Sequence, residues 1–522
     1  MHKNHFLNRT FIFLIFLASG LISSAQIEGD NIFGTNQVIS IDLQFPDADF
    51  WNTLISDYSA DEGAYVPAEL TLTDVTGAYV IDSIGVRLKG NSSYGHPGNK
   101  KSFKLDFNKF VPGQNYDGLK KLNFSNCFKD PSMMREKVFF DVCQAAGVPA
   151  PRTSFANVTM NGTPWGFYTL VEQIDDQFLD WRILDDSGNL FKAGDNFGGG
   201  PGGGTEAADL VYYGAAQNSY EAKYELKTNE DINDWTDLID FIDYINNSSD
   251  AVFAAEIESR MEFSEYIRSV ALDNLFSNLD SYTGSARNYY VYHNQTTNRW
   301  EWIKWDANEA FGSYSNGVNG ILNLVLDYRS NNRPLLDRIF SDPVIYDQYL
   351  SEVCEIREEF FNSTFMDGRI DIIKALIQES VYADNNKMYS NANFDTNIEN
   401  NITSGGGPGG ATIYGLKSFV TQRNSYLDGI LDCSMFTSLE EPADIPFTIS
   451  PNPADDFLRI QWNGGEFIDL RLIDSQGRAV ANIASQGNSI LEVDVRNLAP
   501  GTYFLLSCSS SGKTKAKQVI IE

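Results

Sequence analysis

The chain has 522 residues and a formal net charge of −31, with 42% hydrophobic and 13% aromatic residues. This length and apolar content suit a globular protein with more than one domain. The strong negative charge argues against nucleic acid or an anionic membrane surface as the main partner. We therefore expect no nucleic-acid partner.

The N-terminus has the pattern of a secretory signal peptide, which we assign to residues 1–25. Lys3 and Arg9 supply positive charge, an apolar run follows at 11–18, and small residues precede the predicted cleavage site after Ala25. A short membrane anchor is the alternative, but the run is too short to span a bilayer comfortably. No later segment is as long and apolar as a membrane span, so we expect no transmembrane segment after cleavage.

Five scattered cysteines and four histidines limit two other kinds of site. The cysteines are few and odd in number, which argues against a disulfide scaffold. No Cys-x-x-Cys motif is present, and histidine is scarce, so a zinc site is not expected.

The first part of the mature chain alternates apolar and polar residues, as half-buried strands do. Residues 38–124 therefore predict a β-rich lobe. Asp130-Pro131 predicts the start of a helix that ends at Gly147. Asn161-Gly162 then predicts the turn of a hairpin between strands at 155–160 and 166–172.

Helical spacing dominates the next part of the chain. It predicts helices between 231 and 280, and again at 333–340, 344–361, 369–381 and 414–431, with a β-hairpin at 288–293 and 300–306. A linker is predicted at 433–445. Short strands with turn residues follow at 446–522, which predicts a small all-β, sandwich-like unit.

Two glycine-rich stretches, 196–205 and 405–411, have the flexibility of a phosphate-binding loop. Neither carries the Lys-Ser/Thr pair with which a P-loop opens its helix. We interpret both as surface loops.

Asp280 and Asp306 are the candidate catalytic and metal-binding acids. Asp280 closes a predicted helix, Asp306 closes a predicted strand, and the hairpin lies between them. Phosphoryl transfer needs one acid to orient the attacking hydroxyl and another to hold Mg²⁺. Asn288 and Asn308 follow the two acids and are candidate oxygen ligands for the metal. The alternative is that both acids only cap turns.

A basic strand supplies candidate partners for a nucleotide. Lys104 shares one strand face with Lys100 and Ser102, whereas Lys101 shares the other, apolar face with Phe103 and Leu105. We therefore predict Lys104 as the groove-facing cation and Lys101 as an edge residue. The remaining candidates are the nearby cation Arg87 and two acids that could pair with a lysine, Glu136 and Glu172. An ordinary solvated strand face is the alternative.

Several stretches resemble the CotH kinase family, the spore-coat-protein-H-like atypical protein kinases. They lie at 86–93, 100–107, 121–126, 130–137, 146–152, 165–175, 189–193, 278–282 and 305–312, within a domain of about 38–432. The resemblance implies an α+β, two-lobed kinase-like fold with a β-rich N-lobe and a helical C-lobe. It also implies ATP and Mg²⁺ or Mn²⁺ as cofactors, Asp280 as the catalytic residue and Asp306 as the metal ligand.

Two features depart from the family pattern. The spacing from Asp280 to Asn288 is longer than in the usual kinase catalytic loop. Asp306-Ala-Asn308 stands where many members have Asp-x-Asp, which removes one carboxylate. Both departures concern the metal ligands Asn288 and Asn308.

The tail, residues 446–522, resembles the type A C-terminal sorting domain of the type IX secretion system. The resemblance lies at 449–456, 470–478, 498–505 and 517–522. It implies a Bacteroidota-type bacterium, passage through the periplasm, recognition by the type IX machinery, and release or attachment at the outer cell surface.

The sequence thus predicts an exported CotH-like kinase that transfers the ATP γ-phosphate to Ser/Thr of secreted or cell-surface proteins. The alternative is an inactive surface adhesion or matrix-binding protein on the same fold, because free ATP is scarce outside cells.

Overall fold

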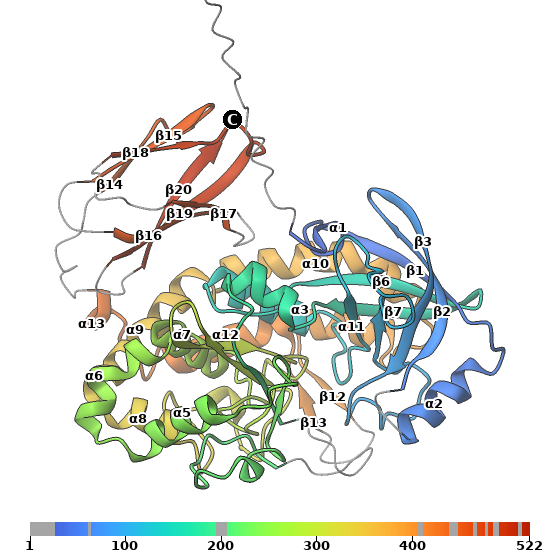
Figure 1. The fold of residues 1–522 in the computed structure, drawn as a ribbon, viewed down its shortest axis with the longest axis horizontal. Helices are drawn as coiled ribbons and strands as arrows, with labels where there is room; N and C mark the ends of the chain where they lie inside the picture. The colour runs from blue at the N-terminus through green and yellow to red at the C-terminus, as the bar shows by residue number, and fades with distance from the viewer. Residues whose placement is uncertain are drawn as a thin grey trace, which may run out of the picture.

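The computed structural model describes residues 27–60, 64–194, 206–404, 411–437, 447–462, 467–474, 479–483, 490–509 and 514–521. The predicted signal peptide, the glycine-rich stretch 196–205, residues 405–410 of the second stretch and most of the predicted linker lie outside these ranges. Figure 1 shows a β-rich part, a helical part and a separate C-terminal β unit. The structure confirms the predicted mixed α+β class.

The β-rich part is a closed barrel with strand order β1-β2-β3-β4-β5-β7-β6. Its strands are β1 (Val38–Gln44), β2 (Val66–Asp74), β3 (Gly77–Leu88), β4 (Phe103–Asp106), β5 (Lys121–Ser125), β6 (Thr153–Met160) and β7 (Thr163–Val171). Parallel pairing of β1 with β6 closes the barrel. The predicted turn residues Asn161 and Gly162 have φ of 45° and 73°, which suits a tight hairpin.

Two helices beside the barrel were not predicted, and a third begins later than predicted. Besides the short α1 (Asp30–Phe33), α2 (Phe50–Ala60) was not predicted, and it buries Phe50, Leu54 and Tyr58 at four-residue spacing. The helix predicted from Asp130 begins later, as α3 (Arg135–Ala145). The prediction was wrong because the Asp130 carboxylate accepts from the Ser132 and Arg135 backbone N–H groups, both at 2.9 Å, and so closes a loop before the helix.

The helical part surrounds a sheet of order β11-β10-β8-β9. The strands are β8 (Leu190–Ala193), β9 (Tyr224–Leu226), β10 (Tyr289–Asn294) and β11 (Arg299–Lys304). The helices are α4 (Asp176–Phe178), α5 (Thr236–Asn247), α6 (Asp250–Arg260), α7 (Phe263–Leu275), α8 (Pro334–Ser341), α9 (Pro343–Glu359), α10 (Ser363–Ala383), α11 (Asn391–Glu399) and α12 (Leu416–Leu427), with a β12 (Ile402–Ser404) and β13 (Ala411–Ile413) ribbon.

Helix α7 ends at Leu275, before the predicted end near residue 279. The Asn278 N–H donates to the Asp273 carbonyl at 2.8 Å, and Ser277 has a φ of 44°, so the chain leaves the helix here. Asp280 therefore lies in a loop between α7 and β10 and does not close the helix itself.

A buried ion pair joins the barrel to the helical part. Lys100 Nζ lies 2.6 Å from Asp384 Oδ2, and the two side chains are 1% and 0% exposed. Asp384 also accepts from the Phe167 N–H of β7 at 3.1 Å. The residue that follows α10 is thus fixed against the barrel.

The C-terminal unit is all-β, as predicted. Its sheets have the orders β14-β15-β18 and β17-β16-β19-β20, and they share an apolar core. The strands are β14 (Phe447–Ser450), β15 (Phe457–Trp462), β16 (Phe467–Asp474), β17 (Ala479–Ile483), β18 (Ile490–Asp494), β19 (Gly501–Ser509) and β20 (Thr514–Ile521). Before it, α13 (Ser434–Thr437) follows Cys433, which forms a disulfide with Cys354 of α9. Of the other cysteines whose side chains the structure describes, Cys127 and Cys143 are free.

Candidate active site

The structure brings Asp280 and Asn288 together in one tight loop, residues 279–288, which we call the Asp280 loop. The Asn288 side-chain amide donates to the Asp280 carbonyl at 2.8 Å. The Ser285 N–H donates to the Leu279 carbonyl at 2.9 Å. A Cβ added at Gly284 would lie 2.0 Å from that same carbonyl oxygen, so only glycine fits this winding.

The Asp280 carboxylate is half-buried, and its surroundings change its acidity. Burial raises the pKa of Asp280, while the positive charges of Arg287 and Lys129 partly oppose this rise. A carboxylate with a raised pKa is a better proton acceptor than an ordinary aspartate. The position and acidity of Asp280 both suit a base that orients a hydroxyl group.

Asp306 and Asn308 follow β11. Asp306 is exposed and has a φ of 47°, a backbone conformation that aspartate tolerates better than most residues. Asn308 Nδ2 donates to the Phe128 carbonyl at 3.2 Å. This hydrogen bond places the segment after β11 against the loop that precedes α3.

Glu309, one residue after Asn308, lies within electrostatic range of Asp280. It is 5% exposed, and its carboxylate lies 3.0 Å from Lys129 Nζ. Burial raises the pKa of Glu309, Lys129 opposes the rise, and the negative charge of Asp280 adds to it. Glu309 and Lys129 were not predicted as site residues, since only the folded chain brings their charges within range of Asp280.

One outer face of the barrel carries a group of cations, Arg87, Lys89, Lys104 and Lys121, which we call the cationic face. Arg87 lies opposite Lys104 in the β3–β4 register, and Lys104 lies opposite Asn123 in β4–β5. Lys104 Nζ donates to Gln173 Oε1 at 2.7 Å. Burial and the charges of Lys121, Arg87 and Lys89 hold the pKa of Lys104 well below its usual value.

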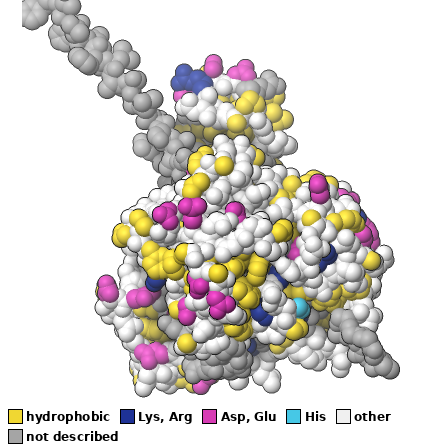
Figure 2. Space-filling model, turned by 90° about the vertical axis from the view of Figure 1, so that its right-hand side faces the viewer, with side chains coloured by type: hydrophobic (Ala, Val, Ile, Leu, Met, Phe, Trp, Pro, Cys, Tyr) yellow, Lys and Arg dark blue, Asp and Glu magenta, His cyan; other side chains and the backbone are white. Residues whose placement is uncertain are grey.

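This concentration of cations is unusual for the molecule, whose net charge is −31. On the face seen in Figure 2, Asp and Glu side chains are spread over the surface with fewer Lys and Arg side chains between them. Positive charges that crowd together and lower one another's pKa values are stabilised by an anion. The cationic face therefore suits a polyanionic ligand such as a chain of phosphates.

Lys89 is the cation of the cationic face whose pKa is affected by Asp306. Burial lowers the pKa of Lys89 to about 8, against the opposing effects of Asp306 and Glu136. Burial and the negative charge of Asp306 raise the pKa of Glu136 to about 8, while Lys89 lowers it. Lys89 Nζ also lies 5.2 Å from the centre of the Trp305 ring and donates to Asn123 Oδ1 at 3.2 Å.

Lys89 belongs to the run of closely spaced cations that the sequence offers for a triphosphate, but it was not chosen as a nucleotide-binding residue. It follows Arg87 by two positions, and period-two spacing on a strand could have placed the two cations on one face. The prediction that Lys104 faces away from the core agrees with the structure, because its neighbours Phe103 and Leu105 are 1% and 0% exposed.

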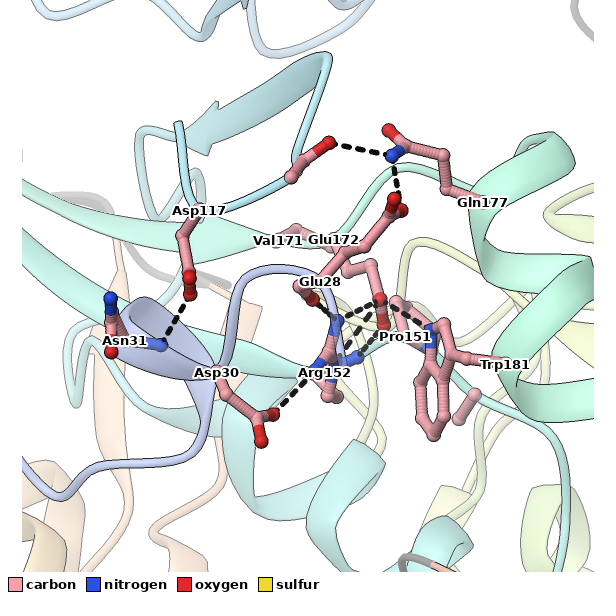
Figure 3. A network of polar contacts seen from close by, with 12 residues as sticks. Glu28, Asp30, Asn31, Asp117, Pro151, Arg152, Val171, Glu172, Gln177 and Trp181 are labelled. Atoms are coloured by element: carbon pink, nitrogen blue, oxygen red, sulfur yellow. Dashed lines mark hydrogen bonds and ion pairs between the residues drawn. The ribbon is translucent and has the colours of Figure 1, made fainter. Parts of the chain in front are cut away.

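In the structure, the Lys101 and Glu172 side chains form hydrogen bonds that hold neighbouring parts of the chain. Lys101 Nζ donates to the carbonyls of Tyr94, at 2.6 Å, and His96, and so supports the loop between β3 and β4. Glu172 accepts from Arg152 Nη2 at 2.6 Å and from Trp181 Nε1 at 2.9 Å (Figure 3). Arg152 therefore occupies the Glu172 carboxylate, and of the two predicted acids Glu136 is the one whose charge acts on a cation of the cationic face, Lys89. A third acid, Asp175, lies 3.8 Å from Lys121 of that face.

A metal ion held by Asp306 would need further oxygen donors, and Asn288 and Asn308 are the predicted ones. The amide nitrogens of Asn288 and Asn308 donate to backbone carbonyls, which leaves each side chain its Oδ1 as a metal ligand. Over the ranges that the structure describes, no group of three or more His, Cys, Asp or Glu side chains is arranged to hold a metal. A site with one carboxylate, amide oxygens and substrate phosphates is the kind that Mg²⁺ uses, so these residues fit it.

The chain is that of a kinase-like protein with a C-terminal sorting tail. The chain belongs to the family described as CotH kinase protein, whose model matches residues 86–427. It is similar to the inner spore coat protein H of Bacillus subtilis (strain 168), with 28% identity over 298 residues, which cover 57% of this chain and 77% of that protein.

A solved structure, the Helicobacter pylori proinflammatory kinase CtkA, matches with 9% identity over 61% of this chain and 90% of that chain. Its TM-score is 0.19, and an overlap this poor carries no weight for the fold.

A second family model, described as secretion system C-terminal sorting domain, matches residues 448–522. This domain indicates recognition by the type IX secretion machinery and export to the medium or the cell surface. None of the helices in the described part of the chain has both the length and the apolar character of a bilayer span.

Proposed function

We propose that this protein transfers the γ-phosphoryl group of ATP, with Mg²⁺ or Mn²⁺, to Ser or Thr hydroxyls of secreted or cell-surface proteins. The observation that carries the proposal is that Lys89 of the cationic face, Glu136 of α3 and Asp306 lie close enough for Asp306 to affect the pKa values of both Lys89 and Glu136, and for these two to affect each other. A lysine paired with a helix glutamate beside a metal-binding aspartate is the arrangement that kinases require.

Asp280 is the residue that we assign to the acceptor hydroxyl. Its carboxylate would accept a hydrogen bond from that hydroxyl, orient the oxygen and receive its proton during transfer. Asn288 holds the Asp280 backbone, and the surrounding burial keeps the carboxylate basic.

The cationic face would bind the phosphates, with Lys89 and Lys104 as the nearest charged donors and Glu136 as the partner that orients Lys89. Asp306, with Asn288 and Asn308, would hold the metal. A bound Mg²⁺ supplies charge neutralisation at the transferred phosphoryl group. Lys101 and Glu172 support this region through the neighbouring backbone and Arg152.

The test is mass-shift and label transfer from γ-labelled Mg-ATP or Mn-ATP, first to the protein itself and then to an unstructured Ser/Thr-rich protein. Asp280→Asn and Asp306→Ala are each expected to lower transfer by about 100- to 10,000-fold. Asp371→Asn, an exposed acid of α10, is the control. Equal activity of wild type and both site variants would contradict the site, and a folded wild type that neither binds nor hydrolyses nucleotide would contradict the function.

We also infer the route of the protein. A signal peptide at 1–25 would direct it to the periplasm, and the sorting domain at 446–522, joined by a linker at 433–445 to the kinase-like domain at 38–432, would direct it across the outer membrane. Mass spectrometry of the mature protein would identify both processed ends.

The sorting domain also favours a second candidate function, a catalytically inactive surface adhesion or matrix-binding protein. ATP is scarce outside the cell, where this domain would send the chain. Calorimetry with Mg-ATP, beside binding to matrix polymers, distinguishes the candidates, because tight polymer binding without nucleotide binding is expected only for the second.

A further inference from the structure

We propose that Arg333 is a positioning residue for phosphoryl transfer, which acts by fixing the Asp280 loop. This inference rests on the proposed function. Arg333 immediately precedes α8 and is far from Asp280 in sequence, but its side chain reaches the loop that carries Asp280.

The Arg333 guanidinium is surrounded by backbone carbonyls. Its Nε donates to the Tyr282 carbonyl and its Nη2 to the Gly284 carbonyl, so two donors span the middle of the Asp280 loop. Its Nη1 donates to the carbonyls of Asn331 and Asn332 at 2.9 and 2.8 Å. The guanidinium also lies over the Tyr282 ring, 5.6 Å from its centre.

Burial increases the free-energy cost of losing any of these hydrogen bonds. Arg333 is 5% exposed, so water cannot replace a carbonyl that moves away. A buried cation that loses a hydrogen-bond acceptor pays a desolvation penalty. The planar fork of arginine fits two carbonyls at fixed positions, whereas a lysine presents one compact charge. The guanidinium therefore favours one conformation of the loop between Tyr282 and Gly284.

Other contacts also secure the loop: the Gly284 N–H donates to the Ser281 carbonyl at 3.1 Å and the Tyr282 hydroxyl to the Asp209 carbonyl at 3.2 Å. The Tyr282 and Gly284 carbonyls themselves both accept from Arg333. The Ala208 N–H donates to the Ala286 carbonyl at 3.0 Å, and the Ser330 N–H donates to the Thr283 carbonyl at 2.9 Å. Because the Ser285 N–H is bonded to the Leu279 carbonyl, a shift of residues 282–284 would move the residue that precedes Asp280. Arg333 thus influences where the Asp280 carboxylate lies.

The test compares Arg333→Lys with a matched control, Arg338→Lys, in the full chain. Arg338 belongs to α8, and its guanidinium donates to the carbonyls of Ile245, at 3.1 Å, and Ser248, both outside the Asp280 loop. We measure kcat for phosphoryl transfer, Kd for Mg-ADP by calorimetry, and the thermal midpoint. Arg333→Lys is expected to lower kcat by about 10- to 100-fold with Kd within about twofold of wild type, because small misplacements of a catalytic group have effects of this size.

The outcomes separate the two proposals. An inactive wild type would overturn the proposed function, whereas an active wild type with equal kcat values for Arg333→Lys and Arg338→Lys would overturn only the role of Arg333. If Arg333→Lys does not fold, Gly284→Ala tests the same loop, since the added Cβ must displace the Leu279 carbonyl. Loss of kcat with retained Mg-ADP binding supports the inference, and an unchanged kcat overturns it.

Discussion

The Asn288 side-chain amide donates to the backbone carbonyl of Asp280 across 2.8 Å and ties the start of β10 to the candidate catalytic residue. Asn288→Ala removes this bond and one possible metal ligand. We expect kcat to fall by about 3- to 10-fold from the lost bond alone, since a net hydrogen bond contributes about 1 kcal/mol.

Whether Asn288 also binds the metal is tested by titrating Mg²⁺ in the transfer assay with Asn288→Ala and, for comparison, with Asn308→Ala. The asparagine that is a ligand is the one whose replacement raises the Mg²⁺ concentration needed for half-maximal rate. If neither replacement changes that concentration, Asp306 holds the metal without these side chains.

Lys89 and Lys101 differ in what their charges contact, and this difference predicts different phenotypes. Lys89→Met is expected to weaken Mg-ATP binding by about 10- to 100-fold, because a hydrogen bond to a charged group contributes about 1.5–3 kcal/mol. Lys101→Met should leave the affinity near that of wild type, since Lys101 donates to the carbonyls of Tyr94 and His96. Calorimetry checks both variants, and a larger loss at Lys101 would contradict the assignment.

Local sequence patterns predict much of the barrel because strand alternation and turn chemistry act over a few residues. The Asn161-Gly162 turn and the outward position of Lys104 were predicted in this way. Helix starts were less predictable: Asp130 has the residue type of an N-cap, but its carboxylate closes a loop that only tertiary contacts reveal.

The candidate site was predicted in part for a similar reason. Asp280 and Asn288 belong to one loop, so their spacing carries information about the contact. Lys89, Glu136 and Asp306 belong to three segments that are far apart in the sequence. A local sequence pattern therefore cannot predict that they lie near one another. Glu172 is a comparable case, because the sequence cannot say that Arg152, and no other cation, is its partner.

The Lys100–Asp384 ion pair predicts a large effect on stability. Asp384→Ala leaves the Lys100 ammonium buried without its carboxylate, and we expect the free energy of unfolding to fall by about 3–5 kcal/mol. The control, Asp371→Ala, breaks a pair with Lys417 in which the acid is 57% exposed, and should cost at most about 1 kcal/mol.

Denaturant unfolding measures both losses of stability. The double variant Lys100→Met/Asp384→Ala should be less destabilised than Asp384→Ala, because it removes the unpaired charge as well. Equal losses for Asp384→Ala and Asp371→Ala would show that the buried pair does not hold the barrel to the helical part.

We expect the stability of the protein to depend on pH through Glu301 of β11, a residue outside the candidate active site. Its side chain is 6% exposed and accepts from Asn294 Nδ2 at 3.1 Å. Burial raises the pKa of Glu301 well above its usual value, and the negative charges of Glu265 and Glu262 add to the rise. Because the folded-state pKa lies above the unfolded value of about 4.3, the related stability is complete below that pH and is lost as pH rises through the folded-state pKa.

Glu301→Gln cannot ionise and should escape this loss. We expect the thermal midpoint of wild type, relative to Glu301→Gln, to be lower at about pH 8 than at about pH 5. Glu256→Gln, which removes an acid 43% exposed in a surface pair with Arg260, controls for the change in net charge. A wild-type-to-variant difference that is the same at both pH values would mean that Glu301 does not ionise over this range in the folded protein.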